Sequence, residues 1–164
     1  MIAIVNTTKD WGIGNGNDLL VHIPEDMKFF RNTTRGKVIV MGRRTLESFP
    51  GGNPLKDRIN IVLSRDPDYK KEGVIVCHSV EEVLDRTAVF PAEDVFVIGG
   101  AQIYRQFLAY CEKALVTRTD IVLPADTYFP NLDESANWKC TKTGSEKEHE
   151  GISFKFTEYT RIDS

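Results

Sequence analysis

Short apolar runs alternate with amphipathic stretches along the first two thirds of the chain. The runs at 38–41 and 95–98 contain only apolar residues, which is typical of strands in a sheet that is covered on both faces. Several runs are followed by segments with apolar residues at helical spacing, and this alternation predicts an α/β fold with a largely parallel sheet. The expected strands are 2–5, 38–41, 58–63, 74–77, 95–98 and 114–117, and the expected helices are 24–34, a short one after 42 that ends near 49, 80–85 and 101–107.

The last third of the sequence contains β-like segments without helices between them. Residues 138–143 and 152–160 have this character, and Ile152, Phe154 and Phe156 occupy alternating positions. The charged stretch 144–151 joins the two segments, so we expect an antiparallel hairpin at the edge of the parallel sheet.

Three glycines alternate at positions 12, 14 and 16. They predict a mobile loop over 10–17 rather than a regular element, because glycine has the greatest backbone freedom. The loop does not open directly onto a helix, so we do not interpret it as a dinucleotide-binding fingerprint.

Composition and charge narrow the class of protein. The 164 residues suffice for one domain, 1–164, with a single core. Lys and Arg number 21 against 24 Asp and Glu, and the net charge of −3 argues against a nucleic-acid or membrane partner. Three widely spaced cysteines indicate a reduced protein, and the apolar start is too short for a signal peptide, so we expect a cytoplasmic location. The histidines are far apart in sequence, so no metal site is expected.

Asp26 lies near the start of the predicted helix 24–34. At helical spacing it shares a face with Ile23, Met27 and Phe30. A carboxylate among apolar side chains is costly unless it is paired, and burial raises its pKa, as in many catalytic acids. The same residue could instead stabilise the helix N-terminus, where acids are common, and these residues alone leave both interpretations open.

Two glycine-containing junctions connect a predicted strand to a helix, at 42–45 and 99–102. At both, helix N–H groups stand at the carboxyl end of a strand, an arrangement that binds anions such as phosphate. Arg43 and Arg44, together with Ser64 and Arg65 at another strand end, add further donors. Ligands of open α/β sheets lie at this edge, so we expect the three segments to converge. For the arginines, a solvated surface position is an equally good interpretation.

Four motifs, in this order and at this spacing, resemble those of bacterial dihydrofolate reductases. They are Ile23-Pro24-Glu25-Asp26-Met27-x-x-Phe30, Val40-Met41-Gly42-Arg43-x-Thr45, Ile98-Gly99-Gly100-x-x-x-Tyr104 and Asp126-Thr127-x-Phe129-Pro130. The resemblance covers essentially the whole chain. It implies a three-layer α/β/α fold with a central, mostly parallel sheet of eight strands, a C-terminal antiparallel hairpin and four flanking helices.

The resemblance also implies an activity, the reduction of 7,8-dihydrofolate to 5,6,7,8-tetrahydrofolate with NADPH. The pterin C6 receives a hydride and N5 a proton, and the product supports one-carbon metabolism and thymidylate and purine synthesis. The resemblance further implies a monomer that binds antifolates such as methotrexate or trimethoprim-type diaminopyrimidines. The alternatives are a same-fold pyrimidine reductase of riboflavin synthesis and a non-catalytic nucleotide-binding module; Asp26 and Arg58 together favour folate.

The functional residues of the family correspond to particular positions of this chain. Asp26 matches the acid that holds the pterin 2-amino group and N3, and Thr117 matches the hydroxyl that supports this acid. The substrate-binding positions are Ile4, Val5, Met27, Phe30, Leu55, Arg58, Ile98 and Tyr104. The cofactor-binding positions are Ile13, Gly14, Asn17, Leu19, Gly42, Arg43, Arg44, Thr45, Leu63, Ser64, Arg65, Gly99, Gly100, Ala101, Gln102 and Ile103, with Arg44 and Arg65 as candidates for the 2′-phosphate.

Three further positions bear on the resemblance. Gly99 and Gly100 match a pair that is joined by a cis peptide bond in the family. Val21 stands where many bacterial members have a tryptophan whose indole holds a water near the pterin, and valine cannot donate a hydrogen bond. Gln102 stands where an arginine often contacts the cofactor pyrophosphate.

Overall fold

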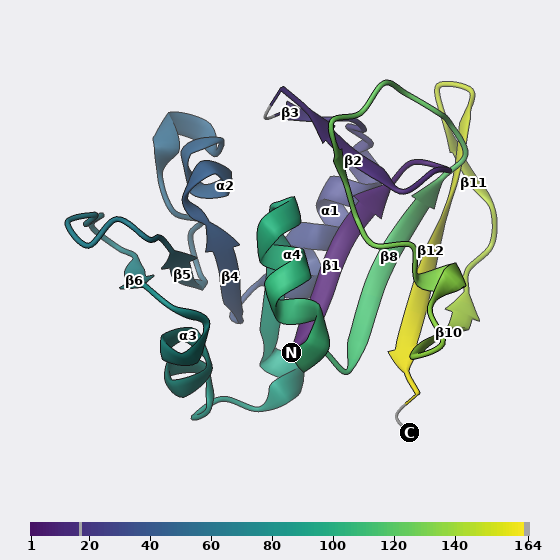
Figure 1. The fold of residues 1–164 in the computed structure, drawn as a ribbon. Helices are drawn as coiled ribbons and strands as arrows, with labels where there is room; N and C mark the ends of the chain where they lie inside the picture. The colour runs from purple at the N-terminus through teal and green to yellow at the C-terminus, as the bar shows by residue number, and fades with distance from the viewer. Residues whose placement is uncertain (17, 163–164) are drawn as a thin grey trace.

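A mixed sheet of nine strands forms the centre of the protein (Figure 1). The computed structural model describes residues 1–16 and 18–162. Eight strands follow the order β10-β12-β8-β1-β7-β4-β5-β6, and the ninth, β11, pairs with β12. Strands β8, β1, β7, β4, β5 and β6 are parallel, whereas β12 is antiparallel to β8 and β10. The strands are β1 Ile2–Thr7, β4 Val38–Gly42, β5 Ile59–Leu63, β6 Ile75–Cys77, β7 Val95–Gly99, β8 Lys113–Thr119, β10 Trp138–Thr143, β11 Lys147–His149 and β12 Ile152–Arg161.

Helices cover both faces of this sheet and complete the predicted α/β/α arrangement (Figure 1). α1 and α2 lie on one face, and α3 and α4 lie on the other. The α-helices are α1 Pro24–Thr34, α2 Arg43–Glu47, α3 Val80–Thr87 and α4 Ala101–Phe107, and the 3-10 turns are η1 Pro50–Gly52, η2 Ala92–Asp94, η3 Leu108–Tyr110 and η4 Leu132–Glu134. Ser79 caps α3, because its side chain accepts a hydrogen bond from the Glu82 N–H.

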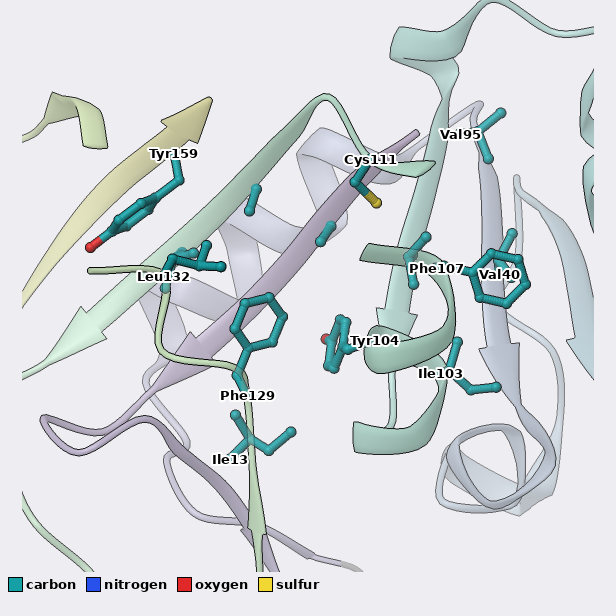
Figure 2. Packing of buried hydrophobic residues seen from close by; sticks show 14 of the residues in the cluster. Ile13, Val40, Val95, Ile103, Tyr104, Phe107, Cys111, Phe129, Leu132 and Tyr159 are labelled. Carbon is teal, nitrogen blue, oxygen red and sulfur yellow. The ribbon is translucent and has the colours of Figure 1, made fainter. Parts of the chain in front are cut away.

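The two faces of the sheet have separate apolar cores. The core on the α1 side, here the α1-face core, includes Ile4 and Leu46. The core on the α4 side, here the α4-face core, includes Phe107 and Phe129, which Figure 2 shows beside the sheet. β1 supplies both cores alternately, because successive strand residues point to opposite faces.

A second sheet of three short strands, β2 Gly12–Asn15, β3 Asp18–Leu19 and β9 Thr127–Tyr128, lies beside the central sheet. The predicted mobile loop over 10–17 is therefore wrong for β2. The glycines permit close contacts instead of forbidding a strand: a Cβ at Gly12 would lie 2.9 Å from Thr8 Oγ1, and one at Gly14 would lie 2.7 Å from Thr127 Oγ1.

The C-terminal hairpin of β10 and β12 is confirmed as antiparallel. The segment 144–151 is not wholly a loop, however, because β11 pairs with the start of β12. Lys147 of β11 forms an ion pair of 3.2 Å with Glu25 of α1, so this segment also contacts the helix that carries Asp26. Among the described residues, no helix is both long and apolar enough to cross a bilayer.

Candidate active site

The carboxylate of Asp26 accepts two side-chain hydrogen bonds from the central sheet. Thr117 Oγ1 donates to Oδ1 at 2.6 Å, and Asn6 Nδ2 donates to Oδ2 at 2.9 Å. Burial raises the pKa of Asp26 above its ordinary value. The two hydrogen bonds oppose this rise, and the bond from Thr117 has the larger effect. The predicted direction of the pKa shift is therefore confirmed.

The strand register explains why these two donors meet one carboxylate. Asn6 of β1 and Thr117 of β8 are direct partners in the parallel pairing, and both point to the face that α1 covers. Pro24 occupies the first turn of α1, and the helix has no side-chain N-cap bond. The Asp26 carboxylate thus contacts the sheet rather than the N–H groups of its own helix, which argues against the interpretation as a helix-terminus residue.

Apolar side chains lie on the same face of the sheet as this carboxylate. Ile4 is buried, and Phe30, Leu55 and Ile98 are partly buried against the α1-face core. Met27 remains 47% exposed, so it lies at the open side of this region. The side chain of Val5 packs in the α4-face core, which leaves only its backbone for a ligand on the α1 face.

Tyr104 connects α4 to this region from the opposite face of the sheet. Its hydroxyl donates a 2.7 Å hydrogen bond to the carbonyl oxygen of Ile4. Burial, followed by the negative charge of Asp26, raises the pKa of the Tyr104 phenol well above its ordinary value. The phenol therefore stays neutral at physiological pH and acts as a fixed donor.

Arg58 lies at the other end of α1 from Asp26. Its guanidinium donates to Thr34 Oγ1 at 2.8 Å and to the carbonyl oxygens of Arg31 and Lys56 at 2.8 and 2.7 Å. Burial, followed by the charge of Arg35, lowers the Arg58 pKa. These bonds use three of the roughly five N–H groups of the Arg58 guanidinium. The remaining N–H groups are available to an anion.

The separation of Arg58 from Asp26 is set by the helix between them. Thr34, which holds Arg58, is eight residues beyond Asp26 in α1, which corresponds to about 12 Å of helix at about 1.5 Å per residue. A ligand that contacted both would need a flat donor group at one end and an anion at the other.

The predicted phosphate-binding segments converge at one edge of the sheet. Met41 of β4 and Gly99 of β7 are register partners, and Thr45 Oγ1 would be the nearest atom, at 3.8 Å, to a Cβ built on Gly100. Gly99 and Gly100 are joined by a cis peptide bond, as the resemblance implied. Two adjacent strand–helix junctions, with no contact tighter than 3.8 Å to a Cβ on Gly100, fit the diphosphate of a dinucleotide.

The arginines at this edge have different surroundings. Arg43 pairs with Glu47 at 3.2 Å and with Asp66 at 3.4 Å, and its guanidinium lies over the ring of Tyr69. Arg44 and Arg65 are exposed, and within the described part of the chain neither forms an ion pair. Arg44 and Arg65 are thus the arginines with charge to offer to a phosphate.

The other predicted cofactor positions are distributed around the same edge. Ser64 is buried, and its Oγ accepts from the Asp66 N–H at 3.3 Å. Ile13 and Ile103 are buried in the α4-face core (Figure 2), so their backbone rather than their side chains faces a ligand. Leu19 on β3 is 66% exposed, and Asn17 lies outside the described residues. Gly14 lies in β2, Gly42 and Leu63 end β4 and β5, and Ala101 and Gln102 begin α4.

Two polar residues of the site were missed in the sequence. Asn6 contacts Asp26 directly, and Thr119 Oγ1 donates to Asn6 Oδ1 at 2.8 Å. Both lie at the ends of strands that the pattern of apolar residues predicted too short. The sequence held one signal for Asn6: it alternates with Ile2 and Ile4, so it places a polar group on a face of the strand that is otherwise buried.

The fold and site together define an α/β enzyme that binds a flat heterocycle beside a dinucleotide. The sequence model of the dihydrofolate reductase family matches residues 1–161. The chain belongs to the dihydrofolate reductase family.

Individual relatives agree with this assignment. The dihydrofolate reductase of Bacillus subtilis is 38% identical over 154 residues, which cover 93% of this chain and 89% of the relative. That of Neisseria meningitidis serogroup A is 39% identical over 150 residues, 91% of this chain and 90% of the relative. The structure of the Enterococcus faecalis enzyme, complexed with NADP(H) and RAB-propyl, superposes with a TM-score of 0.87 at 34% identity, over 99% of this chain and 96% of the other.

Proposed function

We propose that Asp26 is the acid that binds and activates the pterin when this enzyme reduces 7,8-dihydrofolate to 5,6,7,8-tetrahydrofolate. Bound NADPH supplies the hydride in this reaction. The observation that carries the proposal is the position of Asp26: a single carboxyl, half-buried, held by Thr117 and Asn6 beside the apolar side chains of the α1 face.

The hydrogen-bonding capacity of Asp26 supports this role. An ionised carboxylate accepts about four hydrogen bonds, and the strands supply one to each oxygen. One acceptor position per oxygen remains, which suits a ring that presents two parallel donors, the 2-amino group and N3. An anionic acid at this end of the pterin favours protonation of the ring at N5.

The raised pKa of Asp26 affects the pH dependence of the reaction. Because burial stabilises the neutral carboxyl relative to the carboxylate, Asp26 retains a proton at higher pH than an exposed acid. The reaction consumes one proton at N5, and Asp26 with its bound pterin holds that proton before hydride transfer, so the rate should fall as pH increases through the range in which this pair loses it.

The substrate tail and the cofactor have separate contacts in this proposal. Arg58, fixed by Thr34, binds the α-carboxylate of the glutamate tail of folate. Arg44 and Arg65 bind the 2′-phosphate of NADPH, and Thr45 and Ser64 contribute hydroxyls nearby. The backbone at Gly99 and Gly100 lies against the cofactor, since a Cβ on Gly100 would meet no atom closer than Thr45 Oγ1 at 3.8 Å.

We further propose a monomer with one domain over 1–164, located in the cytoplasm. The three free cysteines, Cys77, Cys111 and Cys140, suit a reducing compartment. We also propose that diaminopyrimidine antifolates such as trimethoprim, and methotrexate, bind at Asp26, because a protonated heterocycle with two donors complements its carboxylate.

A steady-state assay tests the proposed function. Purified protein should oxidise NADPH only when 7,8-dihydrofolate is added, and NADH should support a much lower kcat/KM. A pyrimidine intermediate of riboflavin synthesis should give no turnover. Binding of NADPH without turnover on dihydrofolate would instead indicate a non-catalytic nucleotide-binding protein.

A further inference from the structure

We propose that Asn6 is a positioning residue for the reaction: its amide, oriented by Thr119, holds the Asp26 carboxylate in its binding geometry and stabilises its ionised form. This inference rests on the proposed function of Asp26. It assigns the tuning of the acid to a pair of residues that lie outside the motifs of the sequence.

The two oxygens of Asp26 have different donors on adjacent strands. Thr117 of β8 binds Oδ1, and its register partner on β1, Asn6, binds Oδ2. Two donors on rigid parallel strands define both the position and the plane of the carboxylate, whereas Thr117 alone would leave it free to rotate about one hydrogen bond. Asn6 is therefore the contact that fixes the orientation of the acid.

Asp26 and Thr119 together fix the orientation of the Asn6 amide. An amide has a donor end and an acceptor end, and its neighbours decide its orientation. The Thr119 hydroxyl, which is almost completely buried, donates to Asn6 Oδ1 at 2.8 Å. The carboxylate only accepts, so it faces Nδ2, because the reversed amide would place two oxygens together. The Thr119 hydroxyl satisfies the other end of the amide, Oδ1, and holds it in this position.

The surroundings of Asp26 allow the single hydrogen bond from Asn6 to affect the pKa of the carboxyl. No charged side chain among the described residues stabilises the carboxylate; burial raises its pKa, and only Thr117 and Asn6 lower it. On the elements packed around it, α4 contributes the titratable Tyr104, which remains neutral, and Glu25 of α1 pairs with Lys147 of β11. Loss of the Asn6 donor should therefore move the titration of Asp26 upward.

The test uses the Asn6→Leu variant, which keeps the approximate size of the side chain but cannot donate. The Thr119→Val variant removes only the group that orients the amide, and Thr119→Ser restores a hydroxyl as the matched control. Two measurements are made on each full-length protein: the infrared titration of the Asp26 carboxyl without ligands, with Asp26→Asn as the blank, and the pH dependence of hydride transfer.

In Asn6→Leu, the inflection of the infrared titration and that of the hydride-transfer rate should both move to higher pH by about one unit. This is the scale of one lost hydrogen bond to a charged group. Thr119→Val should produce a smaller upward shift, and Thr119→Ser should resemble the parent. A purely structural role would lower Tm in Asn6→Leu and Thr119→Val while leaving both inflections unchanged, and that result would overturn the inference. If Asn6→Leu does not fold, the Thr119 pair decides the question alone.

The two measurements separate this inference from the proposed function. A parent protein without dihydrofolate turnover would contradict the proposed function, while the carboxyl titration without ligands would still report whether Asn6 tunes Asp26. Normal turnover with unshifted Asn6 and Thr119 variants would contradict only the inference.

Discussion

Asp26 and Thr117 are 91 positions apart in the sequence, and a 2.6 Å hydrogen bond joins their side chains. One residue belongs to helix α1 and the other to the central strand β8. Because both elements are part of the packed fold, the acid is held by rigid structure rather than by a loop. The partial burial of this carboxyl has consequences for stability as well as for catalysis.

Replacement of Asp26 by Asn should make stability less sensitive to pH. The pKa of Asp26 in the folded protein is raised above its ordinary value of 3.8, so the folded state binds the proton more tightly than the unfolded state. The stabilising effect of that proton is present below pH 3.8 and is lost as pH rises through the folded-state pKa. Asn does not titrate, so the free energy of unfolding of Asp26→Asn relative to the parent should increase from acidic to neutral pH.

Urea unfolding of both proteins at a series of pH values measures this relative stability. The comparison across pH matters more than the value at any one pH, because the substitution also changes the hydrogen bonds with Thr117 and Asn6. A difference between the two proteins that stays constant from acidic to neutral pH would show that the Asp26 pKa is not raised in the folded state.

Arg44→Ala and Arg65→Ala should weaken the binding of NADPH much more than that of NADH. Each removes an exposed guanidinium from the edge where the phosphate segments converge, and one charge-assisted contact is worth about tenfold to a hundredfold in Kd. Arg86→Ala, in the last turn of α3, is the matched control. Fluorescence titration with both cofactors measures the effect; equal losses for NADPH and NADH would place the 2′-phosphate elsewhere.

Arg58→Leu should raise the KM for dihydrofolate by about tenfold or more, because it removes the proposed partner of the glutamate carboxylate. The kcat should change much less, since Arg58 is fixed at the far end of α1 from Asp26. A dihydropterin substrate without the glutamate tail provides the control and should show the same kinetics with parent and variant. If the variant impairs both substrates equally, Arg58 has a structural role instead.

Gly99→Ala and Gly100→Ala should differ in their effects: the first should lower stability, and the second should weaken NADPH binding. Gly99 has φ +112, and a Cβ there would lie 3.0 Å from the ring of Tyr104, so the free energy of unfolding should fall by about 1–3 kcal/mol or more. A Cβ at Gly100 would meet nothing closer than Thr45 Oγ1 at 3.8 Å. Gly100→Ala should therefore retain stability but weaken NADPH binding, because the methyl group fills space proposed for the cofactor.

Urea unfolding and NADPH titration of both variants measure the two effects. Unchanged NADPH affinity in a stable Gly100→Ala would show that the cofactor does not lie against this backbone.

The sequence predicted the layers of the fold because burial on both faces leaves a direct signal. All-apolar runs such as those in β4 and β7 are typical of strands in a sheet that is covered on both faces. β2 was missed because glycine weakens a strand by propensity, and the pairing that favours it, with Thr127 of β9, comes from a distant part of the chain. β11 was missed because a short charged strand at an edge has the composition of a loop.

The active site, too, has features that the local sequence predicts and features that depend on distant parts of the chain. Helical spacing placed Asp26 on an apolar face, and this was sufficient to suggest an acid with a raised pKa. The contribution of Asn6 depends on the register between β1 and β8 and on the orientation imposed by Thr119, and no local pattern records either. The surroundings of Arg43, which pairs with Glu47 and Asp66, likewise became apparent only from the structure.

The central claim is that the Asp26 carboxyl activates the pterin. The most direct test is the single-turnover rate of NADPH oxidation on dihydrofolate, measured for the parent and for Asp26→Asn from pH 5 to 9. The rate of Asp26→Asn should be lower by about 10²-fold or more at pH 7, and its pH profile should lack the inflection of the parent. An Asp26→Asn protein with the parent's rate and the parent's inflection would contradict the central claim.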